Sequence, residues 1–240
     1  MSIVSSSFLF LFLPLSVLIY HLIPAGKNLF YRNLFLVLVS LFFYAWGEPY
    51  YIFLLLFLML FVHIAGKLID GKRNTIFAKI IVFVTVLLGV GVIIYFRNPN
   101  YYLALIGKLI RHNFSLREAG APLGMSFFVF FAVSYVVDIY RGKCSSPKSF
   151  LYTALYLSAF FKVTQGPIIE YNQFQSQMEN RHADRDMIYR GTKRFLAGLA
   201  KKALIASSLA GISGWLFTGG ISEASVVNAW IGCIACLVNT

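Results

Sequence analysis

Long apolar segments separated by short polar ones run through the whole chain. Residues 3–23 contain no Asp, Glu, Lys or Arg, and a helix of this length covers about 30 Å, the thickness of the hydrocarbon layer of a bilayer. Similar segments follow at Leu29–Trp46, Tyr50–Gly66, Ile76–Phe96, Pro122–Tyr140, Leu151–Phe161, Phe195–Phe217 and from Ala224 onward. The pattern predicts an all-α, polytopic integral membrane protein.

The segment Leu151–Phe161 is too short to cross a bilayer, because its 11 residues fall below the roughly 18 that a spanning helix needs. Gly166 and Pro167 follow it and are expected to end the helix. Backbone groups released at such a break need protein partners or a water-lined cavity at membrane depth. We therefore expect a short or re-entrant helix that borders a binding site, although a plain turn at the membrane surface fits these residues equally well.

Charge is sparse and unevenly placed. Only 12% of the residues are charged, 59% are hydrophobic and the mean hydropathy is +0.74, whereas soluble domains carry about 25% charged residues. The net charge is +12, and the basic residues that cause it are scattered over loops. This distribution differs from the contiguous basic face of a nucleic-acid binder. Basic residues near the ends of the first segments are Lys27, Arg32, Lys67, Lys72, Arg73 and Lys79. Their distribution predicts an N-terminus on the outer side and the lipid bilayer as a partner.

Two later regions modify this simple topology. Between Asp184 and Lys202 basic and apolar residues alternate, as in a helix that lies on the membrane surface against lipid headgroups. The loop Arg97–Ala121 is basic although it should lie outside, so we expect an additional half-crossing at Tyr101–Ile110. No linker or repeat divides the sequence, which predicts one membrane domain over residues 1–240.

Intramembrane polar residues are the first candidates for function, because they are costly in lipid. Asp138 lies in an apolar run, and Arg141 stands three positions later, where the two can pair on a helix. The pair could fix a helix end or line a substrate path. The histidines have no His or Cys at ligand spacing, so no metal site is predicted; they are His21, His63, His112 and His182. For His63, within an apolar segment, we expect a hydrogen-bonded packing role.

Several stretches match a known family in order along the chain. They are Ser40–Pro49, Ala121–Phe128 (APLGMSFF), Ser134–Gly142 (SYVVDIYRG), Gln165–Ile168 with Tyr171 and Phe174, and Arg194–Lys202. Together they resemble the membrane subunits of bacterial alginate O-acetyltransferases, within the membrane-bound O-acyltransferase (MBOAT) family. The resemblance extends from about Phe8 to Trp230.

The resemblance implies a helical bundle with a funnel or tunnel through the bacterial inner membrane. Such an enzyme passes an acyl group, usually acetyl, from acetyl-CoA or another acyl thioester to a cell-surface polysaccharide such as alginate or another cell-wall glycan, commonly with an extracytoplasmic partner protein. A histidine base activates the acceptor hydroxyl, and a water-poor tunnel limits hydrolysis of the donor.

The family's catalytic histidine lies in a later segment, which would begin beyond Thr240. We therefore expect this chain to be the N-terminal portion of such an enzyme, inactive alone and without a catalytic residue of its own. It would contribute tunnel walls and supporting residues, which we predict to be Asp138, Arg141, Gln165, Gly166, Pro167 and Tyr171.

Two other interpretations fit parts of the sequence. A membrane transporter or scaffold without chemistry would also contain broken helices and intramembrane charge. It should show a pseudo-repeated second half and no dependence on an acyl donor. The chain could also be the inactive product of a disrupted gene.

Overall fold

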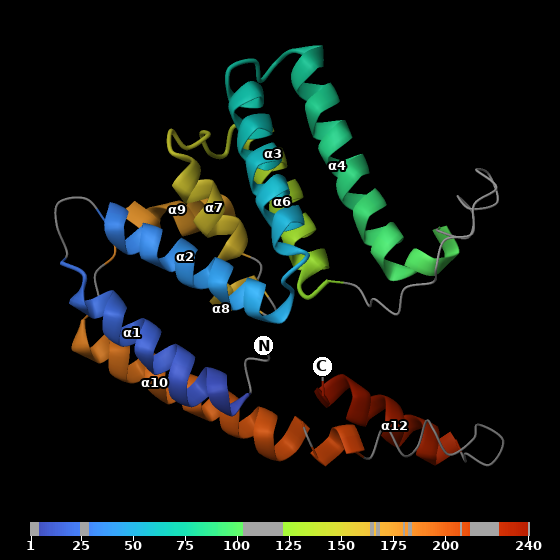
Figure 1. Ribbon diagram of the computed structural model, residues 1–240. Helices are drawn as coiled ribbons and strands as arrows, with labels where there is room; N and C mark the ends of the chain where they lie inside the picture. Colours follow the sequence, from blue (N-terminus) through green and yellow to red (C-terminus); the bar gives the residue numbers. More distant parts are fainter. Residues whose placement is uncertain are drawn as a thin grey trace. The chain divides into compact units, whose positions relative to one another are not determined.

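The computed structural model describes residues 5–24, 29–102, 122–163, 166, 169–179, 181, 184–206, 208–211 and 226–239. Within these ranges the secondary structure is helical and contains no strand, which confirms the predicted all-α class (Figure 1). The chain divides into two compact units, one over residues 7–181 and the other chiefly over residues 182–240. The expectation of a single domain stays a prediction.

Three helices of the first unit are long and apolar enough to cross a membrane. They are α2 (Phe30–Gly47), α3 (Ile52–Asp70) and α4 (Ile76–Arg97). The N-cap of α4 is Thr75, whose hydroxyl accepts a hydrogen bond from the backbone N–H of Ala78 and so satisfies one of the unpaired donors of the first turn. These helices lie within a few residues of the predicted segments, and the protein is a membrane protein.

The first apolar segment forms a helix in two parts, a π-helical turn η1 (Phe8–Phe12) and α1 (Leu13–Leu22). Pro14 follows the π-helical turn. A proline has no N–H to donate and its ring clashes with the carbonyl four residues before it, so the backbone widens at this point. The described helix is shorter than the predicted range Ile3–Ile23, whose first two residues lie outside the described part.

Helix α6 (Met125–Tyr140) packs against α3 and α4, which form an antiparallel hairpin (Figure 1). Glycines allow the close approach: a Cβ on Gly66 would lie 2.7 Å from the Tyr135 ring, and one on Gly89 would lie 2.7 Å from Val129. Small residues at helix contacts are the usual means of close packing in membranes. Helix α6 also contacts α7 (Phe150–Ser158) and α9 (Tyr171–Glu179) and so lies between the hairpin and these short helices.

The short helices differ from the sequence prediction. The sequence predicted one helix over Leu151–Phe161, with Gly166 and Pro167 as its breakers. Instead, α7 (Phe150–Ser158) ends at Ala159, whose ψ of 114° is not helical, and α8 (Phe160–Val163) follows. The break occurs early because α2 supplies a substitute partner: the N–H of Phe160 donates to Ser40 Oγ at 3.2 Å. A neighbouring helix thus satisfies a backbone group that the α7 ladder releases. Helix α9 (Tyr171–Glu179) completes the segment.

In the second unit, α10 (Arg185–Ala200) continues into a π-helical segment η2 (Lys201–Ala206), which contacts α12 (Val226–Asn239). The predicted helix that follows Asp184 is confirmed. The Asp184 side chain caps it by accepting a hydrogen bond from the backbone N–H of Arg185. Phe195 lies within this helix, as the alternation from Asp184 to Lys202 predicted, and the end of the predicted segment Phe195–Phe217 lies outside the described residues. Most of Tyr101–Ile110 and residues 212–225 lie outside the described part.

Candidate functional site

Predicted site residues meet where α6 and α9 approach one another. Asp138, near the end of α6, is only 6% exposed, and its carboxylate accepts a hydrogen bond from Ser134 Oγ at 3.3 Å. Lys143 Nζ lies 3.5 Å from Asp138 Oδ1 and 3.3 Å from Glu170 Oε1. The hydrogen bond and charge of Glu170, and then the charge of Asp138, raise the pKa of the Lys143 amine. One ammonium group therefore links the end of α6 to the residue that precedes α9.

The expected pair of Asp138 with Arg141 is wrong. Arg141 is the exposed C-cap of α6, whereas Gly142 adopts φ 75°, the left-handed conformation that ends many helices. The N–H of Gly142 then donates to Ile139 O and that of Lys143 to Asp138 O, both at 3.0 Å, which is the Schellman arrangement. This turn brings Lys143 back to Asp138. Gly142 was present in the matched stretch and is the signal that could have revealed the true partner.

A buried lysine lies nearby and was not recognised from the sequence. Lys162 of α8 is 1% exposed, and its Nζ lies 3.7 Å from the ring centroid of Tyr156, 4.1 Å from that of Phe131 and 4.3 Å from that of Phe174. Among the described residues the amine has no hydrogen-bond partner. Three aromatic faces therefore surround the amine in place of water. The sequence signal was a lysine directly after a short apolar run.

Tyr171, the first residue of α9, belongs to the same aromatic cluster. Its ring makes edge contacts with Tyr135 at 4.9 Å and with Tyr156 at 5.1 Å between centroids. The Tyr156 hydroxyl donates to Ile169 O at 2.9 Å, which holds the chain just before α9. The hydroxyl of Tyr171 is buried and has no hydrogen-bond partner within the described residues. The cluster thus offers a polar atom to a ligand inside an otherwise apolar region.

Gly166 lies against α8 more closely than any other residue type could. Its N–H donates to Lys162 O at 3.2 Å, and a Cβ at this position would lie 2.2 Å from Lys162 Cα. The glycine is therefore required for the turn that folds the chain back after α8. Gln165 and Pro167, the flanking predicted residues, lie outside the described part of the chain.

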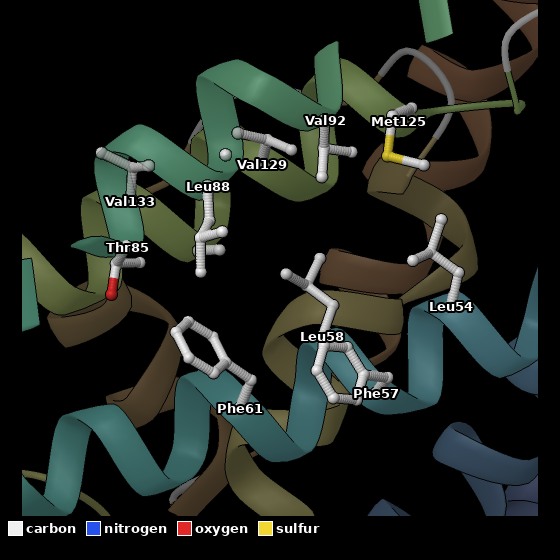
Figure 2. Close-up of a pocket in the computed structure, with 12 residues that line it drawn as sticks. Leu54, Phe57, Leu58, Phe61, Thr85, Leu88, Val92, Met125, Val129 and Val133 are labelled. Atoms are coloured by element: carbon white, nitrogen blue, oxygen red, sulfur yellow. The ribbon is translucent and has the colours of Figure 1, made fainter. Parts of the chain in front are cut away.

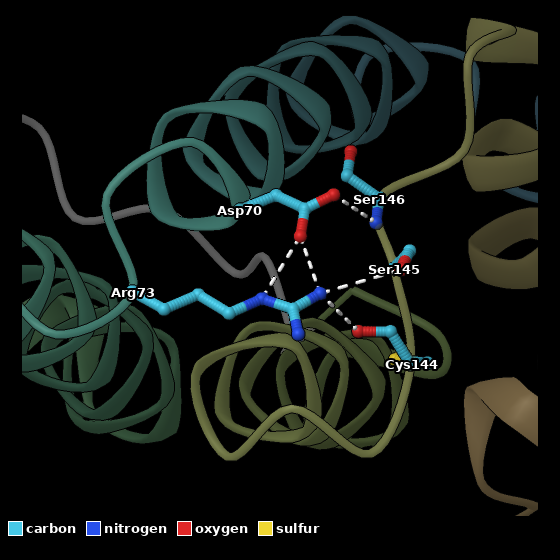
Figure 3. Close-up of polar contacts among 5 residues, drawn as sticks. All are labelled: Asp70, Arg73, Cys144, Ser145 and Ser146. Carbon is cyan, nitrogen blue, oxygen red and sulfur yellow. Dashed lines mark hydrogen bonds and ion pairs between the residues drawn. The ribbon is translucent and has the colours of Figure 1, made fainter.

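A polar clamp joins the turn after α3 to the loop after α6 (Figure 3). Arg73 pairs with Asp70 and also donates to Cys144 O at 3.1 Å. Asp70 Oδ2 in turn accepts from the N–H of Ser146 at 2.9 Å. Burial, and then the charge of Asp138, raises the pKa of the Cys144 thiol to about 11. The clamp fixes the start of the loop that leads into α7.

His63 has the packing role expected from the sequence. It is 6% exposed, its Nδ1 lies 2.9 Å from Thr153 Oγ1 of α7, and its ring makes an edge contact with Phe150. The described residues contain no group of three possible metal ligands. His63 therefore joins α3 to α7 by one buried hydrogen bond.

An apolar cavity of about 110 Å³ lies between α3, α4 and α6 (Figure 2). Phe57 and Phe61 of α3 face Leu88 of α4 and Val129 of α6 across it. The hydroxyl of Thr85 at its edge donates to Ile81 O at 2.8 Å, so it is already satisfied. The cavity suits an apolar group and not a charged one.

Comparison with known proteins adds the decisive observation. The chain is 31% identical over 236 residues to a probable alginate O-acetylase of Azotobacter vinelandii, which covers 96% of the chain and 46% of that protein. The corresponding protein of Pseudomonas putida is 30% identical over 241 residues, with 96% and 47% covered. The chain is a homologue of the alginate O-acetylases. The resemblance to the membrane-bound O-acyltransferase family, of the alginate O-acetyltransferase type, is thereby confirmed.

A relative of lower identity is a peptidoglycan O-acetyltransferase of Helicobacter pylori, 26% identical over 252 residues, with 93% of the chain and 48% of that protein covered. The chain spans about half the length of the curated relatives it matches, which fits the expected correspondence to one portion of such a protein. No family model and no solved structure matches the chain.

Proposed function

We propose that the chain forms the N-terminal part of a membrane O-acyltransferase that passes an acyl group, in the first place acetyl, to a hydroxyl of a cell-surface polysaccharide. The observation that carries the proposal is the similarity to alginate O-acetylases along 96% of the chain. The spanning helices and the broken segment between α7 and α9 support it, because non-helical backbone at membrane depth is tolerated where it is covered by protein or lines a cavity. Alginate and peptidoglycan, the polymers named for the two kinds of relative, are the first acceptors to test.

In this proposal the acceptor oxygen attacks the carbonyl carbon of an acyl thioester, a base removes its proton and a thiolate leaves. The base is a histidine of the remaining part of the enzyme. The described residues act by holding the path dry and in shape: the aromatic cluster around Lys162 and Tyr171 forms a wall, and Asp138 anchors it through Lys143. Gly166 permits the turn beside it, and Arg141, Gln165 and Pro167 are proposed as its remaining supports.

The surroundings follow from the same proposal. The enzyme lies in the bacterial inner membrane with its N-terminus outside. Basic residues gather after the first helix and between α3 and α4, and loops rich in basic residues lie on the cytoplasmic side. A cytoplasmic acyl thioester such as acetyl-CoA is the donor, and an extracytoplasmic protein completes delivery to the polysaccharide.

Deletion of the gene followed by complementation tests the proposal. O-acetyl groups on exported polysaccharide and on peptidoglycan are measured in the deletion strain and after return of the natural gene. We expect acetylation of one of these polymers to disappear and to return with the gene. Unchanged acetylation of both polymers in the deletion strain would refute the proposal, and an altered export without altered acetylation would favour a transporter.

A further inference from the structure

A groove of about 290 Å³ runs between α1 and α2. Leu15 and Ile19 line it from α1, and Phe35, Val39 and Trp46 line it from α2. The hydroxyl of Ser16, at its wall, donates to Phe12 O at 2.6 Å and is thus satisfied. The groove therefore has an apolar surface with no unsatisfied side chain among these residues, as a hydrocarbon chain requires.

Two arginines flank a tyrosine at one end of this groove. The guanidinium carbon of Arg32 lies 5.1 Å from the ring centroid of Tyr20, and that of Arg181 lies 5.7 Å from it. Arg32 donates to Ile23 O at 2.8 and 3.0 Å. Arg181 donates to the Tyr20 hydroxyl at 2.9 Å and to Asn33 Oδ1 at 3.1 Å. All these acceptors are neutral, and in the described part of the chain neither arginine pairs with a carboxylate.

Two like charges beside one ring at the edge of an apolar region repel one another unless an anion joins them. The pair also retains donors for such an anion. Arg32 Nη1 has no acceptor among the described residues, and the Tyr20 oxygen, which accepts from Arg181, still has its own O–H to donate. Guanidinium groups favour phosphate, because their planar fork matches two of its oxygens.

The two features are continuous along α2. Phe35, Val39 and Trp46 follow Arg32 at helical intervals that place them on one face. The α2 residues that line the groove, from Phe35 to Trp46, extend over about 16 Å at 1.5 Å per residue, which matches the roughly 15 Å hydrocarbon depth of one leaflet. Arg32 lies in the first turn of α2 and Tyr20 in the last turn of α1, where the apolar helices end and lipid phosphates are found.

We propose that the groove between α1 and α2 binds one anionic phospholipid, with its phosphate at Arg32, Arg181 and Tyr20 and an acyl chain along Phe35, Val39 and Trp46. This site is independent of the proposed transferase chemistry. It would hold the first two helices together and tie them to the chain that follows α9, where Arg181 lies.

The test uses the full chain, purified in mild detergent, stripped of lipid and titrated with phosphatidylglycerol in native mass spectrometry. We expect phosphatidylglycerol to bind, and the Arg32→Gln/Arg181→Gln protein to bind it about tenfold more weakly, since charge-assisted contacts to phosphate are lost. The matched control, Lys79→Gln/Arg97→Gln, removes the same charge from exposed positions of α4 and should bind as the unchanged protein does.

A second variant tests the groove without altering charge. Val39→Phe fills it and should weaken binding of phosphatidylglycerol, whereas Leu87→Phe on the exposed face of α4 should not. Val39→Phe also keeps the proposal testable if the double arginine variant fails to fold. Equal binding of phosphatidylcholine would exclude an anionic headgroup. Displacement of the lipid by millimolar inorganic phosphate would indicate a free-phosphate site, and either result, or unaltered binding by both variants, would overturn the proposal.

Discussion

Helices α4 and α7 are both apolar, yet the longer of the two is mostly exposed and the shorter is mostly buried. Helix α4 has 22 residues, and its only buried positions are Ala78, Thr85 and Gly89. Helix α7 has nine residues, of which the run Thr153–Ser158 is entirely buried. The longest described helix is thus among the most exposed, and a much shorter one is the most completely covered by protein.

The difference shows what lipid can and cannot replace. Lipid covers the sides of a continuous helix such as α4, because all its internal backbone groups are paired within the helix. A broken segment has released N–H and C=O groups, which only protein can satisfy in the hydrocarbon layer. The pairing of Phe160 N with Ser40 Oγ is one such substitute. Burial at a break, more than apolar length, therefore marks the region where a site can be built.

Gly166→Ala should have the largest effect and would sharpen this contrast. The added Cβ would lie 2.2 Å from backbone carbon of Lys162, and neither side can move without unfolding the turn. We expect a loss of at least about 3 kcal/mol in the free energy of unfolding, seen as loss of monodisperse protein in detergent and a lower thermal midpoint.

The matched control is Gly91→Ala in α4, where no atom lies within 4 Å of the new Cβ. There the change should be neutral or stabilise by up to about 1 kcal/mol, because alanine is the better helix former. Equal thermal midpoints for the two variants would show that the broken segment is no more constrained than the long helix.

Lys162→Glu should have the second-largest effect and lower the free energy of unfolding by about 3–5 kcal/mol, because it places an unpaired anion against the negative faces of three rings. Lys162→Met, which keeps the length and removes the charge, should be as stable as the natural protein or more so. Lys79→Glu, at an exposed position of α4, should change stability by less than about 0.5 kcal/mol. A destabilising Lys162→Met would mean that an acceptor outside the described residues holds the amine.

Asp138→Ala should have a smaller effect, about 1 kcal/mol, and Lys143→Gln should lower the thermal midpoint in the same direction. Arg141→Gln should leave the midpoint unaltered, because Arg141 is exposed and does not pair with Asp138. In the Lys143→Gln background the effect of Asp138→Ala should shrink, which a double-mutant cycle measures. Coupling of Asp138 to Arg141 instead would contradict the observed turn at Gly142.

The smallest expected effect is on the reactivity of Cys144, measured in a Cys233→Ser/Cys236→Ser protein. Its pKa is raised to about 11, so at pH 8 only about one thiol in a thousand is the reactive thiolate. Alkylation should accelerate about tenfold per pH unit from 8 to 10 without reaching a plateau. The alkylation rate of a Lys72→Cys variant, with its thiol in the exposed turn before α4, should level off near the ordinary pKa of a thiol. A plateau for Cys144 below pH 9 would show that the clamp leaves it open to water.

Much of the fold could be predicted from the sequence because membrane crossing depends on a local property. The limits of α2 and α4 follow from where apolar residues begin and end, and the cap at Thr75 agrees with this. The break at Ala159, where α7 ends, could not be located in this way. Its break depends on Ser40, more than a hundred residues away, and no local pattern in α7 reveals that partner.

The candidate site divides in the same manner. Asp138, Gly166 and Tyr171 were selected from local motifs, and the structure places them around one segment. The partner of Asp138 was misassigned, because a helical spacing rule favours Arg141 and takes no account of the reversal at Gly142. Lys162 was overlooked altogether, since a lysine after an apolar run resembles an ordinary membrane-interface residue until its aromatic neighbours are known.

By itself, then, the sequence determined that this protein lies in a membrane, where the spanning helices α2, α3 and α4 lie along the chain and to which proteins it is related. These properties depend on hydrophobic length and on ordered motifs, both of which are written along the chain. Only the tertiary structure decided that Lys162 is enclosed by Phe131, Tyr156 and Phe174, and that Arg32 and Arg181 meet at Tyr20. Such contacts join residues far apart in the chain, and their energies arise from mutual distance and shared burial, which exist only after the helices have packed.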